Sequence, residues 1–422
     1  MYFSTKLIAV AALALSSHAS PLDLRGPSPA SLNGIVGQNK NYTTIPQVID
    51  RGFNPHSYSV SGPVVYSQAL RKFKAPVPSA ASAAAAAAVS KASSGGTGSV
   101  AAQPQAYDYE YLCSVQIGTP AQTLALNFDT GSSDLWVFSS LTPSRQVKGQ
   151  AIYNPSKSST AKSLANYKWG ITYGDGSKAS GVVYTDVVKI GTFTINGQAV
   201  EAANSVSSSF TASSATNGLL GLGFQNLNTV SPSKQTPVYQ TAKKNMTNYL
   251  FTANLKKGKA GSYNFGYIDK AQYTGSITYT PVNTNPGYWA FTSSGYAIGS
   301  GAFTSASITA IADTGTSLLL LPSSIVSNFY KQVKGAAYSN TYGGYVFPCS
   351  TSVPKFTFGV GGYRGVVPGS YMVYGAVNTT HCYGGMQAIA GSYAIFGDVL
   401  LKSQFVVFDA GNTRLGFAAK TL

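Results

Sequence analysis

The tripeptide Asp-Thr-Gly occurs twice in this chain of 422 residues, within FDTGSS at 128–133 and within ADTGTS at 312–317. Each copy follows an apolar segment with the character of a strand. Each is also followed further along by two apolar residues and a glycine, LLG at 219–221 and IFG at 395–397. A repeat of this length is far longer than the unit of a solenoid. The repeat therefore predicts two similar β lobes, each contributing one turn that carries an aspartate.

The composition agrees with an all-β chain. Hydrophobic residues make up 44% of the sequence, and 44 glycines break it into short segments. Runs at 111–118, 124–128 and 182–188 have the pattern of strands. The clearest helical signal is 323–333, where we expect a serine to cap an apolar stripe. The fold class that follows is two β lobes with a cleft between them and few short helices.

The charge balance is strongly positive, with a formal net charge of +16, although charged residues are only 10% of the chain. A high positive charge raises the possibility of nucleic-acid binding. Here lysines and arginines are mostly scattered, and the excess reflects the scarcity of acidic residues. We therefore expect no nucleic-acid partner. Separately, we expect the protein to be a monomer.

The first residues have the form of a secretory signal peptide. Lys6 precedes an apolar stretch, 7–15, and small residues at 17–19 offer a cleavage site. The alternative is a buried N-terminal helix. No later segment reaches the roughly 20 apolar residues that span a bilayer. We expect residues 1–19 to be removed and the protein to be secreted to the extracellular space, with no membrane attachment.

The next segment, 20–98, differs from the rest because it is rich in Pro, Ala and Ser and ends in a Gly/Ser-rich linker. It is either a pro-region or a disordered spacer. The basic stretch 71–74 favours a pro-region, since it could mask an acidic cleft by charge pairing. The two lobes are then expected at 99–278 and 279–422.

Asp129 and Asp313 are the candidate catalytic residues. Two carboxyls held face to face cannot both ionise readily, so one keeps a proton while the other is charged. Such a pair can act as general base and general acid on one water molecule. The glycines permit tight turns, the threonines can tie the two turns together, and the next hydroxyls can bind the outer carboxylate oxygens. These supporting residues are Thr130, Gly131, Ser132, Thr314, Gly315 and Thr316.

Other hydrolytic mechanisms lack their residues. Beyond the N-terminal segment the chain has one histidine, His381, so a Ser-His-Asp or Cys-His site has no good base. No cysteine pair has metal-ligand spacing, so we expect neither a metal nor another cofactor. Of the three cysteines, Cys349 and Cys382 could pair in an oxidising compartment, which leaves Cys113 as a buried free thiol.

The region from about residue 107 to 422 resembles the pepsin family, and in particular its secreted fungal branch. The matching motifs are DTGSSDLWVF at 129–138, ITYGDGS at 171–177, FGYID at 265–269, ADTGTS at 312–317 and FGDVLLKS at 396–403. The resemblance implies a zymogen of an aspartic endopeptidase that is active at acidic pH. It also implies protein and peptide substrates and inhibition by pepstatin-type compounds.

The resemblance assigns further roles by position. Tyr173, Gly174 and Asp175 would lie on a flap that closes over substrate, with Trp136 supporting the tyrosine. Asp175 implies that Lys is accepted before the cut bond, besides large apolar residues. The remaining implied assignments are Phe210 and Leu219 in the wall of the main specificity pocket, a Cys349–Cys382 disulfide, and Lys72 as the residue that masks both aspartates in the zymogen.

The sequence also offers two candidate glycosylation sites and two alternative functions. The sequons at Asn245 and Asn378 are candidate glycosylation sites in a secreted chain. A catalytically inactive pepsin-like binding protein and a basic binder of polyanions are the alternative functions. The first is disfavoured by two intact Asp-Thr-Gly motifs and an intact flap tyrosine, and the second depends on charge alone.

Overall fold

The computed structural model describes residues 42–48, 61–93, 110–172, 178–211 and 215–422, all within one compact unit, Val36–Leu422. The flap residues Tyr173, Gly174 and Asp175 lie outside the described residues, as do the signal-peptide segment and the linker at 94–109. In the described part of the chain, no helix is long and apolar enough to cross a membrane.

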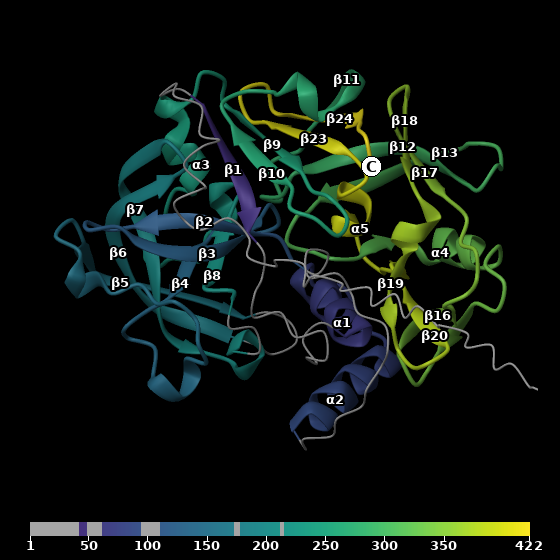
Figure 1. The fold of residues 1–422 in the computed structure, drawn as a ribbon, viewed down its shortest axis with the longest axis horizontal. Helices are drawn as coiled ribbons and strands as arrows, with labels where there is room; N and C mark the ends of the chain where they lie inside the picture. The colour runs from purple at the N-terminus through teal and green to yellow at the C-terminus, as the bar shows by residue number, and fades with distance from the viewer. Residues whose placement is uncertain (1–41, 49–60, 94–109, 173–177, 212–214) are drawn as a thin grey trace, which may run out of the picture. The chain divides into compact units, whose positions relative to one another are not determined.

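Strands dominate the described residues, as the sequence predicts (Figure 1). The N-terminal half and the segment before it contain β1 (Thr43–Val48), β2 (Leu112–Ile117), β3 (Gln122–Asp129), β4 (Leu135–Phe138), β5 (Lys162–Thr172), β6 (Lys178–Ile190), β7 (Phe193–Val206), β8 (Gly218–Gly221), β9 (Leu250–Asn254), β10 (Ser262–Phe265) and β11 (Thr274–Pro281).

The second half has its own strands. They are β12 (Ala290–Ile298), β13 (Thr304–Ala312), β14 (Leu319–Leu321), β15 (Ala337–Ser339), β16 (Gly344–Pro348), β17 (Phe356–Val360), β18 (Tyr363–Val367), β19 (Val373–Ala376), β20 (His381–Gly384), β21 (Met386–Ala388), β22 (Ala394–Phe396), β23 (Phe405–Asp409) and β24 (Arg414–Ala419).

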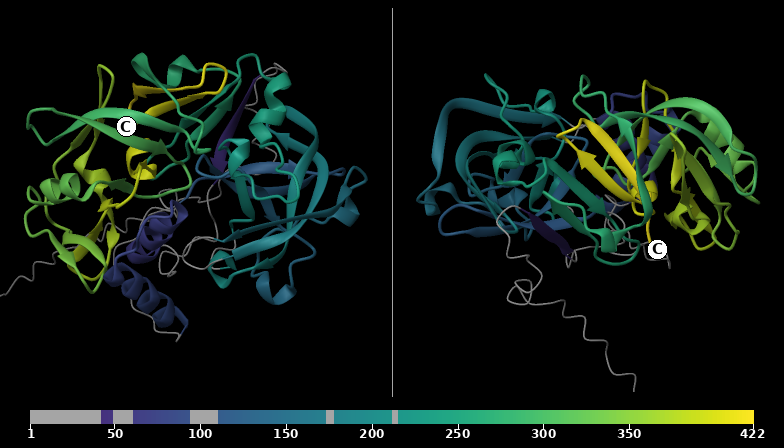
Figure 2. Two further views of the ribbon diagram at one scale, coloured as in Figure 1. Left: turned by 180° about the vertical axis from the view of Figure 1, so that it is seen from behind. Right: turned by 90° about the horizontal axis from the view of Figure 1, so that it is seen from above.

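These strands form three sheets. The largest runs β11-β24-β23-β9-β10-β1-β2-β3-β8-β4-β7-β6-β5, so the last two strands of the chain join strands of the first half. The second sheet runs β18-β17-β12-β13-β22-β14-β21, and the third β15-β16-β20-β19. Figures 1 and 2 show the teal N-terminal strands and the green C-terminal strands as two separate groups within this unit.

The repeat seen in the sequence has a matching topology in the two halves. Strand β3 pairs in parallel with β8, placing Asp129 opposite Gly221. Strand β13 pairs in parallel with β22, placing Ala312 opposite Phe396. Each Asp-Thr-Gly turn is therefore flanked by the strand that contains its later apolar-apolar-Gly motif. This confirms the expectation of two similar β lobes.

Helices are short, and the two longest lie in the segment expected to be a pro-region or spacer. The helices are α1 (Gly62–Lys72), α2 (Ser79–Ser93), α3 (Val238–Thr241), α4 (Ser323–Tyr330) and α5 (Asp398–Leu401). The alanine run at 83–88 lies inside α2, although the composition around it is typical of a flexible segment. Alanine has the highest helix propensity, so this run is helical where its neighbours allow it.

Helix α4 confirms the predicted helix but corrects its ends. It stops at Tyr330, three residues before the expected end, and its N-cap is Pro322, with no side chain capping it. Ser323 is instead the first helical residue. The helix depends on its apolar face, with Ile325, Val326 and Phe329 buried, because packing of such a face supplies most helix stability in proteins.

Helix α1 packs against the second half of the chain (Figures 1 and 2). Its Val65, Tyr66 and Leu70 belong to a buried cluster with Leu320, Ile389 and other residues of that half. The hydroxyl of Tyr66 donates a 2.6 Å hydrogen bond to the carbonyl of Ala388. This packing fixes the end of α1, where Lys72 is the last residue.

Candidate active site

The two Asp-Thr-Gly turns meet at the junction of the two halves. Asp129 is the last residue of β3, and Asp313 follows directly after β13. Their side chains are 1% and 0% exposed. Both sites are thus positioned by buried central strands, which hold a side chain more rigidly than a surface loop does.

The threonines join the two turns by reciprocal hydrogen bonds. The hydroxyl of Thr130 donates to the carbonyl of Ala312 at 2.8 Å, and that of Thr314 donates to the carbonyl of Phe128 at 2.6 Å. Each threonine hydroxyl also accepts from the other's backbone N–H, at 3.2 and 3.0 Å. All these groups are buried, so neither turn can shift without breaking bonds of the other.

Each carboxylate receives the same two donors from its own turn. Gly131 N–H donates to Asp129 Oδ1 at 2.8 Å, and Ser132 Oγ donates to Oδ2 at 2.6 Å. Gly315 N–H donates to Asp313 Oδ1 at 3.0 Å, and Thr316 Oγ1 donates to Oδ2. The two carboxyl groups are therefore oriented alike.

The two motif glycines are required by the closeness of the opposite aspartate. A Cβ atom on Gly131 would overlap the carboxylate of Asp313, and one on Gly315 would overlap the carboxylate of Asp129. Any side chain at either position would push the two carboxyls apart. Glycine is therefore required at both positions by the short distance between the two aspartates, here called the dyad, as well as by the geometry of each turn.

The Lys72 ammonium lies between the two carboxylates. Its Nζ is 2.8 Å from Asp129 Oδ1, 3.2 Å from Asp313 Oδ1 and 2.9 Å from Asp313 Oδ2. The lysine side chain is 13% exposed. The structure thus brings together the two predicted aspartates, their supporting residues and the predicted masking lysine.

The electrostatics of this trio are strongly coupled. Burial raises the pKa of Asp313 to about 6 and the nearby charge of Asp129 acts in the same direction, against the lowering effect of Lys72. Burial also acts to raise the pKa of Asp129, but the charge of Lys72 outweighs it and the net pKa is lowered. Burial acts to lower the pKa of Lys72, yet the two aspartates raise it overall. The lysine is therefore a firmly held cation.

The predicted pocket residues belong to an aromatic and apolar cluster in the half of the chain that carries Asp129, with Leu219 on β8, the strand beside β3. The Trp136 ring lies 5.2 Å from that of Phe210, edge to face, and 5.9 Å from that of Trp169, stacked. Leu219 and Phe210 pack against the same buried cluster. Trp169 was not predicted, although it lies on β5, the strand that leads into ITYGDGS.

A second residue missed by the sequence analysis is Tyr288. Its ring centroid lies 5.4 Å from that of Phe73, the residue after Lys72. The charges of Lys72, Asp313 and Asp129 all affect its pKa, which burial raises. Tyr288 is therefore close to the dyad, but it lies 25 residues before Asp313 and in no motif that would mark it.

The cysteines behave as expected. Cys349 and Cys382 form a disulfide with a Cα–Cα distance of 5.0 Å. Cys113 is a buried free thiol on β2. The one histidine of the globular region, His381, is the first residue of β20, and its Nδ1 contacts the hydroxyl of Thr380. Within the described residues, no cluster of three His, Cys, Asp or Glu side chains could hold a metal.

The sequon asparagines Asn245 and Asn378 both lie within the described residues. The side-chain amide of Asn245 donates to the backbone carbonyl of Thr194 at 3.3 Å, and the side-chain oxygen of Asn378 accepts from the N–H of Thr380 at 2.9 Å. These contacts do not test whether either residue carries a glycan, so glycosylation stays a prediction.

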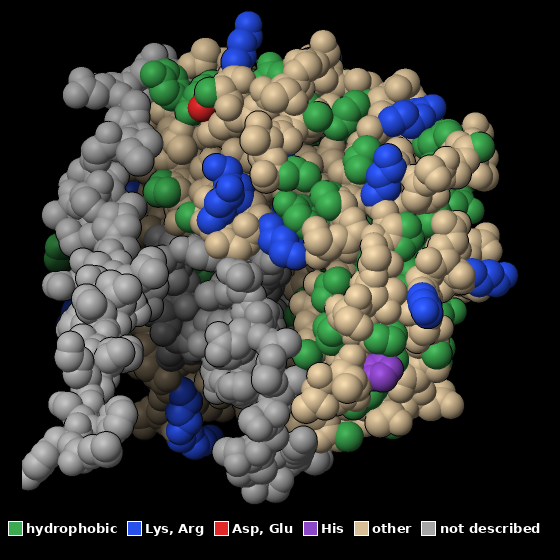
Figure 3. Space-filling view, turned by 45° about the vertical axis from the view of Figure 1, so that its right-hand side comes forward, with side chains coloured by type: hydrophobic (Ala, Val, Ile, Leu, Met, Phe, Trp, Pro, Cys, Tyr) green, Lys and Arg blue, Asp and Glu red, His purple; other side chains and the backbone are tan. Residues whose placement is uncertain are grey.

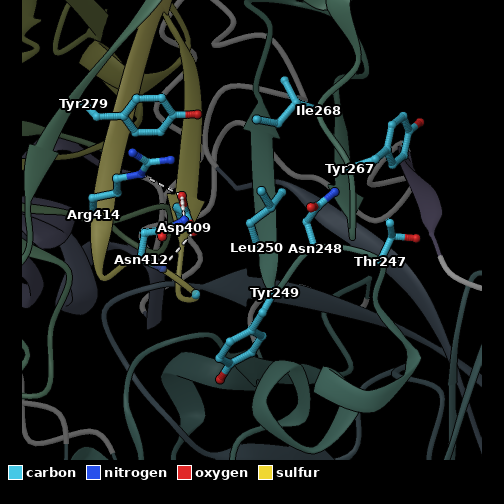
Figure 4. A pocket seen from close by; sticks show the side chains of 11 residues that line it. Thr247, Asn248, Tyr249, Leu250, Tyr267, Ile268, Tyr279, Asp409, Asn412 and Arg414 are labelled. Carbon is cyan, nitrogen blue, oxygen red and sulfur yellow. Dashed lines mark hydrogen bonds and ion pairs between the residues drawn. The ribbon is translucent and has the colours of Figure 1, made fainter.

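A separate pocket of about 700 Å³ lies away from the dyad, and its lining contains none of the predicted site residues (Figure 4). Its one cation, Arg414, donates to Asp409 Oδ2 at 2.7 Å and lies 3.9 Å over the ring of Tyr279. The same carboxylate also accepts from Asn412 at 2.9 Å. The charged groups of this pocket are thus satisfied by one another, and we assign no ligand to it.

Comparisons with known proteins agree with this geometry. The family model described as eukaryotic aspartyl protease matches residues 110–420. Endothiapepsin from Cryphonectria parasitica is 51% identical over 372 residues, which cover 87% of this chain and 88% of the relative. Podosporapepsin from Podospora anserina is 54% identical over 319 residues, 75% of each protein. Penicillopepsin-3 from Penicillium janthinellum is 51% identical over 356 residues, 84% of this chain and 87% of the relative.

The match spans both Asp-Thr-Gly turns and both lobes, and it agrees with a buried pair of carboxyls on interlocked turns. The chain therefore belongs to the eukaryotic aspartyl protease family and is a pepsin-like aspartic endopeptidase.

Proposed function

We propose that Asp129 and Asp313 are the catalytic residues, and that the chain is a secreted zymogen whose mature form cleaves proteins and peptides at acidic pH. The observation that carries this proposal is the pair of buried carboxyls, held by matching donors on turns that are hydrogen-bonded to each other. Two carboxyls that share one proton are the established pattern of aspartic proteases as a class, so the shared proton proposed for this dyad follows a known case.

In the proposed reaction, the ionised aspartate removes a proton from a water molecule while the protonated one donates its proton to the carbonyl oxygen of the peptide bond. The water oxygen forms a bond to the carbonyl carbon, which gives a tetrahedral diol. One hydroxyl proton then returns to an aspartate, a proton passes to the amide nitrogen, and the C–N bond breaks. The dyad ends with one proton, as it began.

The masking role of Lys72 is supported by its contacts to both carboxylates. A water molecule could not occupy the position of the ammonium between them. Lowering the pH protonates the carboxylates and weakens both ion pairs, so acid would release the lysine. We therefore propose that residues 20–98 are a pro-region, that 1–19 are a signal peptide, and that 99–278 and 279–422 are the two lobes, with residue 278 inside β11.

The substrate preference rests on the apolar cluster in the half of the chain that carries Asp129. Phe210 and Leu219 are half-buried and offer a surface for a large apolar side chain, while the fully buried Trp136 packs against Phe210. We propose that Asp175, on a flap formed with Tyr173 and Gly174, also accepts a lysine before the cut. Pepstatin-type inhibitors are expected to bind the same cleft.

The face of the molecule shown in Figure 3 gives the polyanion alternative no support. Lysine and arginine side chains are spread among uncharged residues on this face and form no continuous patch. We propose a monomer that is glycosylated at Asn245 and Asn378 and has no nucleic-acid partner.

The test is cleavage of a denatured protein at acidic pH by the acid-treated chain, with and without pepstatin. Cleavage that pepstatin blocks supports the proposal. Absence of cleavage at every pH from about 2 to 7, with the fold intact, would favour the inactive binding protein instead.

A further inference from the structure

A second pair of buried carboxyls lies behind the active-site turn of the first half. Asp134 comes two residues after Ser132, and Glu201 is on β7. Each residue is 1% exposed. Among the described residues, neither forms a salt bridge. Two acidic groups buried together without a cation partner are unusual, because burying a lone charge is strongly unfavourable.

One asparagine holds both groups. Asn228 Nδ2 donates to Asp134 Oδ1 at 2.8 Å and to Glu201 Oε1 at 2.9 Å. Asp134 Oδ1 also accepts from the N–H of Thr229 at 2.8 Å. The other oxygens, Asp134 Oδ2 and Glu201 Oε2, are buried with no donor. Because one amide nitrogen contacts both carboxyls, the two groups lie side by side, and one proton held between them would avoid two buried negative charges at one place.

The surroundings contain no cation that touches either group within the described residues. Lys234 acts on Asp134 from a distance, but its Nζ donates to the backbone carbonyls of Asn226 and Asn228, at 2.7 and 3.0 Å. On the strands beside Glu201, the paired residues are Trp136 of β4 and Val183 of β6, neither of which carries a charge.

Four ionisable side chains lie on β6: Lys178, Tyr184, Asp186 and Lys189. Lys178 is the exposed first residue of the strand, and Tyr184 pairs with Val200. Asp186 accepts from the hydroxyl of Tyr153 at 2.7 Å and from Thr160, so its carboxylate has separate partners. Lys189 pairs with Thr194 near the far end of the strand. Burial raises the pKa of Asp134 to about 6, and burial together with the charge of Asp134 raises that of Glu201 well above its usual range.

The pair is linked to the turn that carries Asp129. The Asn228 amide that binds both carboxyls also donates to the carbonyl of Ser133 at 3.2 Å. The backbone carbonyl of Asp134 accepts a 2.9 Å hydrogen bond from the N–H of Gly221. Gly221 in turn lies opposite Asp129 in the pairing of β3 with β8. A displacement of Asp134 would therefore move the segment that follows the catalytic turn.

We propose that Asp134 and Glu201 share one proton, and that this protonated pair makes Glu201 a positioning residue for the turn bearing Asp129. The effect on catalysis rests on the proposed function, whereas the shared proton does not. An acid that keeps its proton in the folded state binds more protons than the unfolded chain above its ordinary pKa of about 4. The contribution of this pair to the stability of the fold must then decrease as the pH rises from about 4 through 6 and beyond.

The test uses Glu201→Gln, whose amide is a permanent donor in place of the shared proton. The melting temperature is measured at pH 4, 5, 6 and 7 on the full chain carrying Asp313→Asn, which prevents self-processing. The parent is expected to lose at least about 4 °C more than Glu201→Gln between pH 4 and pH 7. Equal losses in both would overturn the proposal.

Asp186→Asn is the matched control, because Asp186 is another 1% exposed acid of the same half but has its own donors. It is expected to lower the melting temperature without flattening its pH dependence. Flattening by this variant as well would contradict the specific role of the pair.

Two further measurements distinguish the shared proton from a general effect on stability and from the catalytic step. Infrared difference spectra at pH 6 should show a protonated carboxyl band that is lost in Glu201→Gln, and an unchanged band would overturn the proposal. In the mature enzyme, Glu201→Gln should keep the kcat of the parent at pH 4 and a larger fraction of it at pH 6.5, with KM unchanged. If no variant cleaves any substrate, the proposed function fails while the melting and infrared results still decide the proton.

Discussion

Replacing Lys72 by methionine tests the masking contact with nearly the same side-chain volume and no charge. At neutral pH the change leaves two buried aspartates facing each other without their cation. Removing one partner of a buried ion pair usually destabilises a protein by about 3–5 kcal/mol. Here the loss is limited because Asp313, with a pKa of about 6, can take up a proton.

We therefore expect a loss of about 3 kcal/mol at pH 7 and a smaller one at pH 4, since protonation of the dyad weakens the contact in the parent too. With an unfolding entropy of roughly 0.9 kcal/mol per degree for a chain of this length, the loss corresponds to about 3 °C in melting temperature. The sign follows from Asp313, whose pKa of about 6 leaves it protonated at pH 4, so that the ammonium of Lys72 then faces one carboxylate instead of two. The lowered pKa of Asp129 keeps that carboxylate ionised at pH 4, and its ion pair is lost only as the pH falls through the lowered value.

The assay compares melting temperature and pepstatin binding of the full chain at pH 7 and pH 4. Lys72→Met should bind pepstatin at pH 7, where the parent does not. Lys74→Met is the control, since Lys74 is an exposed lysine two residues away. If Lys72→Met behaves like Lys74→Met in both measurements, the masking contact has no energetic weight and the reasoning is refuted.

Three further changes test separate parts of the site and fold. Ser132→Ala removes a hydroxyl that donates a 2.6 Å hydrogen bond to Asp129, so the pKa of Asp129 should rise by about one unit. The acid limb of the pH profile of kcat/KM should shift to higher pH by the same amount, and an unshifted limb would contradict this. Gly315→Ala should reduce kcat by at least about 100-fold, because the new methyl group overlaps the carboxylate of Asp129; near-normal activity would show that the dyad tolerates separation. Cys382→Ser should lower the unfolding free energy by about 3–4 kcal/mol in urea, from the loop of 33 residues that the disulfide closes, whereas loss of no more than about 1 kcal/mol would show that the bridge is dispensable.

Much of the site could be predicted because it lies in two short motifs. The residues around Asp129 and Asp313 are within three positions of each aspartate, so turn geometry alone brings Ser132 and Thr316 to their carboxylates. The pairing of the two turns followed from the repeat. The disulfide and the position of Lys72 were implied by family resemblance, and the structure joins the two cysteines and brings the lysine to both aspartates.

The unpredicted features depend on contacts between distant segments. Glu201 and Asp134 are 67 positions apart, and only the pairing of β4 with β7 brings them together. Strand β1 pairs with β10, more than 200 residues later. Helix α2 could not be predicted for a different reason, because the Pro, Ser and Gly residues around its alanine run are typical of a flexible segment and conceal the helix propensity of alanine.

The most direct test of the central claim is the pH dependence of kcat/KM for the mature enzyme on an apolar peptide, measured beside Asp129→Asn and Asp313→Asn. A dyad that works with one proton gives a bell-shaped profile with two macroscopic pKa values, and each substitution should reduce kcat/KM by at least about 1,000-fold. If either variant kept a rate within about tenfold of the parent, or if the parent profile showed no acid and alkaline limbs, the account of a shared-proton dyad would be contradicted.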